Sequence, residues 1–342
     1  MQDMLIVDAD GHLRDLVDNC YRPYLEPPFN DRAVFWPSDG FDRNKNGRLG
    51  VRDVDAPRQL HDMDVEGIDI SILYPTTGLG IGKIYEPDYA AALCRAYNNW
   101  VHDYCATDPQ RLKAVALLPL QDVDAAVREL HRAVVDLGLV GGMLPTYVRR
   151  GPSLGDKALW PLYAEAEQLD VPLGAHATGG ETDSEGRFPT FLGVHICSHV
   201  PEQMIALTSV VLGGIFEQFP RLRYGFLEAG CGWVPFWMEH MDEEWEKRRD
   251  EAPLCKEKPS TYITSGRCYF GCEPEEKTMP FAAANVGEDV LLYASDYPHW
   301  DSDWPHTVKT VRERTDMSEQ LKRKVLAENA LRFYGLKAAV PA

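Results

Sequence analysis

The sequence of 342 residues predicts an α/β fold, a (β/α)8 TIM barrel with an insertion after the first strand and an extra C-terminal helix. Short apolar runs typical of strands alternate with longer segments of helical spacing, which indicates βαβ units and a parallel sheet. The apolar runs number eight, the number of strands in this barrel. A doubly wound open sheet is the alternative. No G-x-G-x-x-G follows the first run, so nothing supports a dinucleotide site there.

The strands and helices are expected in strict alternation. The strands are residues 5–10, 69–75, 113–119, 140–145, 171–177, 223–230, 261–270 and 291–298. The helices are residues 87–105, 122–138, 156–170, 201–220, 234–250, 273–287 and 303–315, followed by the extra helix at 318–336. Asp122 is a typical N-cap and Gly138 a typical stop for the second helix. Residues 14–60, rich in Pro, Asp, Gly and aromatics, form the expected insertion, a lid over the barrel mouth of a single domain of residues 1–342.

Composition excludes several classes of partner. The chain has 53 acidic and 35 basic residues and a formal charge of −18, which disfavours nucleic acid and anionic membranes. The eight cysteines contain no C-x-x-C pair, so we expect reduced thiols and no structural zinc site. No basic segment precedes an apolar stretch at the N-terminus, and no apolar run is long enough to span a membrane. We expect a cytoplasmic protein.

Polar residues end four of the expected strands. Asp10 and His12 end the first, where Asp8, Asp10 and His12 are spaced to share one face of an extended strand. His176 ends the fifth strand, Glu228 the sixth and Asp296 the eighth. Because the carboxyl ends of barrel strands meet at one face, these side chains should converge.

Two imidazoles and two carboxylates form a ligand set for one divalent metal ion. Alone, each residue has an ordinary structural explanation, since a histidine at a strand end is often only hydrogen-bonded and an aspartate often caps the next helix. Four such residues at the same end of four strands favour a site. We therefore predict Asp10, His12, His176 and Asp296 as metal ligands.

Several segments of the chain resemble the amidohydrolase-related family of the metal-dependent hydrolase superfamily. They are DADGHL near the start, GAHA in the fifth strand, GGIFEQFPRLRYGFLEAGCGWVPFWMEHMD, YASDYPHWDSDWP and the terminal ENALRFYGL. The closest branch contains non-oxidative decarboxylases of aromatic and unsaturated acids, of the aminocarboxymuconate-semialdehyde type, beside carbon–carbon bond hydrolases. The resemblance implies a barrel enzyme that is often a dimer, and we expect a homodimer.

The resemblance also implies site residues, with two departures. The family's metal ligands fall on Asp10, His12, His176 and Asp296, although many members have His-x-His where this chain has Asp10. Glu228 stands where the decarboxylases place a catalytic histidine. The expected fourth strand contains no lysine to bridge a second metal, so one ion is expected, most simply zinc. The additional carboxylate of Asp10 favours harder ions, so manganese is possible.

Three functions stay open at this point. In a decarboxylase, Asp296 would deliver a proton to the carbon that loses CO₂. In a hydrolase of a C–C, ester or amide bond, Glu228 or Asp296 would take a proton from metal-activated water. His199, at the start of a helix, is a further catalytic candidate. The third possibility is a barrel that has lost catalysis.

The expected substrate is a small carboxylic acid, and its anionic group requires a cation in an otherwise acidic protein. Arg267 in the expected seventh strand is the first choice and Arg58 the second. Tyr74, His299 and Trp300 are expected to line an aromatic pocket, whereas His195 is expected to lie farther from its centre.

Overall fold

The computed structural model describes residues 4–15, 20–32, 54–149, 151–177 and 187–337. Its strands are all parallel and form two hydrogen-bonded sheets, β1-β2-β3 and β4-β5-β6-β7-β8-β9. They are β1 (Val7–Leu13), β2 (Ile70–Pro75), β3 (Leu112–Ala114), β4 (Ala116–Leu117), β5 (Gly142–Pro145), β6 (Leu173–His176), β7 (Tyr224–Leu227), β8 (Cys268–Cys272) and β9 (Leu291–Tyr293).

Backbone hydrogen bonds join the two sheets at both edges. β3 and β4 are halves of the expected third strand, in which the Val115 N–H donates to β2 and the Ala116 N–H donates to Gly141, just before β5. At the other edge, the His12 N–H donates to the Tyr297 carbonyl oxygen at 2.7 Å, and the Asp296 N–H donates to the Asp10 carbonyl oxygen at 3.2 Å. The chain after β9 therefore closes onto β1, and the (β/α)8 barrel is confirmed.

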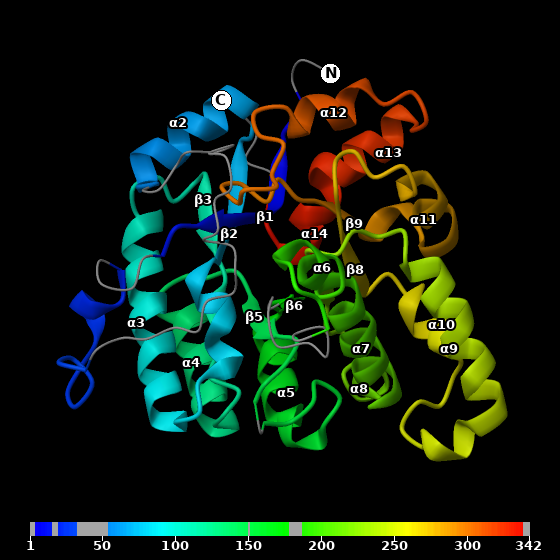
Figure 1. Cartoon of the computed structure of the whole chain (residues 1–342), viewed down its shortest axis with the longest axis horizontal. Coiled ribbons are helices and arrows are strands. Elements are labelled where there is room, and N and C mark those ends of the chain that lie inside the picture. The colour runs from blue at the N-terminus through cyan, green and yellow to red at the C-terminus, as the bar shows by residue number, and fades with distance from the viewer. Residues whose placement is uncertain (1–3, 16–19, 33–53, 150, 178–186, 338–342) are drawn as a thin grey trace.

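Helices surround the strands, and α3, α4 and α5 pack side by side on the outside of the barrel (Figure 1). The α-helices are α2 (Ala56–Glu66), α3 (Pro87–Cys105), α4 (Val123–Val135), α5 (Trp160–Leu169), α6 (Phe191–Ile196), α7 (His199–Leu212), α8 (Ile215–Gln218), α9 (Val234–Arg248), α10 (Pro259–Ile263), α11 (Met279–Val286), α12 (Thr307–Glu313), α13 (Glu319–Arg323) and α14 (Asn329–Tyr334). Short helical turns are η1 (Arg22–Tyr24), η2 (Thr77–Lys83), η3 (Lys157–Leu159), η4 (Arg249–Glu251), η5 (Glu288–Val290) and the π-turn η6 (Lys324–Glu328).

The end signals of the second expected helix are confirmed in part. The Asp122 side chain accepts a hydrogen bond from the Ala125 N–H and caps α4. Gly138 has a φ of 70°, which favours glycine, but α4 already ends at Val135. The expected helix at 201–220 breaks after Leu212, because the chain turns through Gly214 at φ 73° before α8.

The expected seventh strand, 261–270, was misplaced. Pro259 opens the short helix α10, since proline suits the first turn of a helix, and Gly266 at φ 79° then turns the chain into β8. The strand runs from Cys268 to Cys272, so residue 273 directly follows a strand and does not begin the helix expected at 273–287.

The expected insertion is only partly described, because residues 16–19 and 33–53 lie outside the described ranges. Residues 56–60 belong to α2, which Asp55 caps by accepting from the Arg58 N–H. η1 packs beside α3, where the Tyr24 hydroxyl donates to Asp103 at 2.6 Å. A lid formed by residues 14–60 stays a prediction. None of the helices described is both long and apolar enough to cross a membrane.

Candidate metal centre

A bulge in β1 directs the polar side chains of this strand to its two opposite faces. The pairing with β2 shifts between Asp8 and Gly11, and a Cβ at Gly11 would lie 2.5 Å from Asp8 Oδ2. Asp8 and Gly11 therefore face the same way, and Asp10 and His12, on either side of Gly11, face the other way. The expectation that Asp8 shares their face was wrong. Its carboxylate instead accepts from the Ser71 and Ser295 hydroxyls, and burial raises its pKa to about 6.

The four predicted ligands meet around His12. Its Nε2 lies 3.7 Å from Asp10 Oδ1 and 3.4 Å from Asp296 Oδ1, and His176 Nε2 lies 3.4 Å from Asp10 Oδ1. These four buried atoms have no hydrogen-bond partner among the described residues. Two ligand atoms bound about 2.1 Å from one ion at a tetrahedral angle are about 3.4 Å apart. The ligand atoms of Asp10, His12 and His176 all lie within 4.8 Å of one another, which fits a divalent ion. Asp296 belongs to a second such group, with His12, Glu228 and His299, and His12 is common to both.

The other ring nitrogens of the two histidines are held by backbone. His12 Nδ1 donates to the Pro75 carbonyl oxygen, and His176 Nδ1 to the carbonyl oxygen of Ala177, each at 3.0 Å. With the proton on Nδ1, each Nε2 keeps its lone pair directed toward the cluster. Burial and the neighbouring His299 also lower the pKa of His12 far below its usual value, which favours the neutral imidazole that binds metals.

Two site carboxylates sit on unusual backbone. Glu228 follows β7 at φ 57° and Asp296 follows β9 at φ 54°. Besides them, only Asp170, at the end of α5, has a positive φ among described residues other than glycine. Left-handed backbone is disfavoured for such residues and concentrates at functional sites, where it directs a side chain.

Glu228 and His299 join the same cluster. Glu228 Oε2 lies 3.2 Å from His176 Nδ1, and His299 Nδ1 lies 2.6 Å from Asp296 Oδ1. The His299 ring stacks on His12 at 3.9 Å between centroids, and its Nε2 hydrogen-bonds the Thr76 hydroxyl. Burial and the carboxylate of Glu228 raise the pKa of Asp296 well above its usual value.

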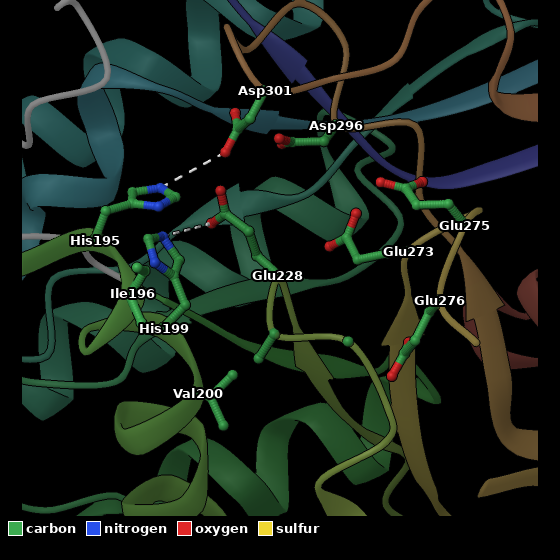
Figure 2. A pocket seen from close by; sticks show the side chains of 12 residues that line it. His195, Ile196, His199, Val200, Glu228, Glu273, Glu275, Glu276, Asp296 and Asp301 are labelled. Carbon is green, nitrogen blue, oxygen red and sulfur yellow. Dashed lines mark ion pairs between the residues drawn. The ribbon is translucent and has the colours of Figure 1, made fainter. Parts of the chain in front are cut away.

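A pocket of about 500 Å³ opens beside this cluster. Figure 2 shows the carboxylates of Glu228, Asp296 and Asp301 directed into it, with His199 and His195 on the opposite wall. His199 Nε2 lies 3.9 Å from Glu228 Oε2, and burial together with His195 lowers the His199 pKa to about 3. His199 is therefore neutral at pH 7.

The two predicted arginines do not reach the pocket. Arg267 precedes β8, at the opposite end of the barrel, where its Nη1 donates to the Phe216 carbonyl oxygen at 2.9 Å. Arg58 lies on α2 and pairs with Asp62 at 2.5 Å, and Asp62 in turn accepts from the Tyr297 hydroxyl. Arg267 was assigned to the site because its strand was misplaced.

The predicted aromatic residues surround the cluster without entering the pocket lining. The Tyr74 ring packs 5.2 Å from the His176 ring, and its hydroxyl hydrogen-bonds Tyr334. Tyr74 thus supports the histidine from inside the barrel. Trp300 packs against His195, with their ring centroids 5.4 Å apart, near the pocket wall.

Sequence reasoning missed two pocket residues, His195 and Glu273. His195 was expected to lie far from the centre, but it lines the pocket 3.6 Å from Asp301. Glu273 also lines the pocket directly after β8, as Glu228 does after β7. The sequence signal for Glu273 is a polar residue that directly follows an apolar strand. It was missed because the strand was expected at 261–270, whereas β8 spans Cys268–Cys272.

The amidohydrolase family model matches residues 57–336. The chain belongs to the amidohydrolase family. A gamma-resorcylate decarboxylase of Rhodococcus jostii (strain RHA1) is 31% identical, covering 79% of this chain and 84% of that enzyme. One from Rhizobium sp. (strain MTP-10005) is 27% identical, covering 90% of this amidohydrolase and 94% of the relative.

Solved structures share the fold of this amidohydrolase at lower identity. A 5-carboxyvanillate decarboxylase from Sphingomonas paucimobilis has a TM-score of 0.81 at 20% identity, covering 98% of this chain and 100% of that chain. A dihydroxybenzoic acid decarboxylase from Polaromonas sp. JS666, with bound manganese and 2-nitroresorcinol, has a TM-score of 0.76 at 22% identity, covering 97% of each chain.

Proposed function

We propose that this amidohydrolase catalyses metal-dependent, non-oxidative decarboxylation of an aromatic or unsaturated carboxylic acid. The observation that carries the proposal is the convergence of three buried donor atoms without hydrogen-bond partners among the described residues, on Asp10, His12 and His176, with Asp296 beside His12. The decarboxylase relatives support the reaction type, because they align over most of the chain.

These four residues would hold one divalent ion, which when bound supplies Lewis-acid polarisation of substrate oxygens. Two neutral imidazoles and two aspartates balance its charge. Zinc accepts this ligand set, but the two carboxylates also suit manganese, which the Polaromonas relative binds. We propose that the bound ion is zinc, with manganese as the alternative. Metal analysis of protein purified without added ions distinguishes the two.

The chain's own residues would position the acid and move one proton. Cleavage of the bond to the carboxylate releases CO₂ and leaves an electron pair on carbon, which must take up a proton. Asp296 and Glu228 reach the pocket from adjacent sides, and His299, 3.5 Å from Glu228 Oε1, lies between them. We assign proton delivery to Asp296, with Glu228 and His199 completing the relay to solvent.

The anionic end of the substrate needs a cation, and Arg14 replaces Arg267 and Arg58 in this role. Arg14 follows β1 two residues after His12. Burial, His176 and, after them, the charge of Arg14 lower the pKa of His299. It would orient the substrate carboxylate at the metal end of the pocket.

Hydrolysis of a C–C, ester or amide bond is the second candidate, favoured by Glu228. A carboxylate 3.2 Å from His176 Nδ1 is a conventional general base for a water beside the metal. The product separates the two reactions. Decarboxylation in D₂O gives CO₂ and one deuterium on carbon, whereas hydrolysis gives a new acid that contains solvent oxygen.

The test is a panel of hydroxy- and aminobenzoates and unsaturated diacids incubated with metal-loaded enzyme. We expect CO₂ release with stoichiometric deuterium incorporation for at least one acid, and loss of both in His12→Ala. Hydrolysis products without CO₂ would contradict the proposal in favour of the second candidate. Neither product, in protein that binds metal, would favour the non-catalytic barrel.

We also propose a cytoplasmic homodimer. All eight cysteines are free thiols, as expected in a reducing compartment. Large apolar side chains are exposed on neighbouring helices α6, α7 and α9, namely Leu192, Ile196, Ile205 and Phe236. Light scattering of wild type and Phe236→Glu tests this surface: a dimer that the substitution dissociates is expected, and a wild-type monomer would contradict it.

A further inference from the structure

Acidic side chains dominate the pocket beside the metal centre. Six carboxylates line it, namely Glu228, Glu273, Glu275, Glu276, Asp296 and Asp301. Among the described residues of the lining there is no lysine or arginine, and Arg14 lies outside this lining. A divalent ion would balance Asp10 and Asp296 only. The remainder of the pocket therefore stays negative, which is unfavourable for a second anionic group on the substrate.

Four of these carboxylates have protein partners. Asp296 and Glu228 belong to the metal cluster, and Asp301 lies 3.6 Å from His195. Glu276 points away from the pocket centre in Figure 2, because it accepts from the N–H groups of Cys231 and Gly232. Each of these four carboxylates thus already has a contact partner within the protein.

Glu273 differs from all of them. Its side chain makes no hydrogen bond or ion pair with any described residue, and Figure 2 shows its carboxylate directed toward Glu228 across the pocket. Glu275, its neighbour on the same turn, is exposed to solvent. Glu273 itself is only partly buried, and a carboxylate held among other acids is stabilised by a positive partner.

We propose that Glu273 is a specificity residue that binds a protonated amine or guanidine on the substrate. This deepens the proposed function, on which it rests: the substrate is then a carboxylic acid that carries a cationic group at the end remote from the metal. Burial and the nearby acids raise the pKa of Glu273 to about 8, and a bound cation would relieve this repulsion.

The test is calorimetric binding to the metal-loaded full chain with matched aromatic acids. The probes are para- and meta-(aminomethyl)benzoate, the (hydroxymethyl)benzoates of the same shape, and terephthalate with isophthalate. We expect an aminomethyl compound to bind about tenfold or more tightly than its hydroxymethyl partner, and the dicarboxylates to bind most weakly. A wild-type protein that prefers the hydroxymethyl or dicarboxylate compounds, or binds no amine, overturns the proposal.

Glu273→Gln should reduce the amine preference to within about threefold and leave hydroxymethyl binding unchanged, which also reports a folded pocket. Glu275→Gln, on the same turn but exposed, is the matched control and should keep the preference. If Glu273→Gln binds none of the probes, the binding preference is measured in Glu273→Asp instead. This variant keeps a carboxylate and should still prefer the aminomethyl compound. A preference that persists in Glu273→Gln overturns the assignment. Binding needs no turnover, so an amine preference without CO₂ release would reject only the decarboxylase function.

Discussion

His176 and Glu228 meet at the ends of adjacent strands β6 and β7, with His176 Nδ1 3.2 Å from Glu228 Oε2. The same imidazole presents its other nitrogen to Asp10 at 3.4 Å. One ring therefore joins the proposed metal ligands to the carboxylate of Glu228. Its ring orientation depends on both sides, so changes at Glu228 can alter the chemistry without removing a ligand.

Glu228→Gln should lower turnover by about 10²- to 10⁴-fold, because the amide cannot take up or release the proton. Metal content should stay near the wild-type value, since Glu228 is not among the four proposed ligands. The measurement is kcat for the most reactive acid of the panel, beside metal analysis, with Glu275→Gln as control. Near-native kcat would remove Glu228 from the reaction.

His12→Ala should abolish the rise in thermal stability that added manganese or zinc gives the wild type. A ligand at a hundred times its Kd stabilises the folded state by about 2.7 kcal/mol. The variant should not gain this stabilisation, because it has lost a ligand of the proposed metal site. The control is His131→Ala, because His131 is exposed and pairs with Glu165 on the outer helices. An equal metal-induced shift in His12→Ala would place the ion elsewhere.

Gly11→Ala should destabilise the protein by about 1–3 kcal/mol. Its Cβ would lie 2.5 Å from both Asp8 Oδ2 and Ser71 Oγ, which are themselves fixed by hydrogen bonds. Denaturant unfolding measures the change. Gly271→Ala in β8 is the matched control, because its Cβ would meet atoms only at 3.4 Å and beyond. Equal stability of the two variants would contradict the bulge geometry.

The stability of the wild type should fall as pH rises from about 4.5 to about 8, in part through Glu273. Its pKa is about 8 in the fold against 4.5 as its ordinary value, so the folded protein binds more protons in this window. One such group contributes a slope of at most about 1.4 kcal/mol per pH unit. Glu273→Gln should flatten the slope of unfolding free energy in this range. An unchanged slope would show that Glu273 ionises normally.

The barrel and the convergence of the polar residues at its strand ends were predictable because both depend on short-range pattern. Strand–helix alternation gives the order of elements, and the polar residues after strands one, five, six and eight meet wherever the barrel closes. The bulge at Gly11 was not predictable, since it follows from the contact of Asp8 with Ser71 and Ser295, which are distant in sequence.

The substrate-binding residues were harder to predict than the ligands. An error of a few residues in the seventh strand placed Arg267 in the pocket and hid Glu273, because opposite ends of one strand face opposite ends of the barrel. His195 also escaped notice, since its place depends on how α6 packs near Trp300 and Asp301.

The central claim is tested most directly by metal analysis of the full chain purified without added ions, beside Asp10→Ala, His12→Ala and His176→Ala. The account predicts about one equivalent of zinc or manganese in the wild type and less than about one-tenth in each variant. A wild type that holds less than about one-tenth of an equivalent, and gains no stability from either ion, would contradict it.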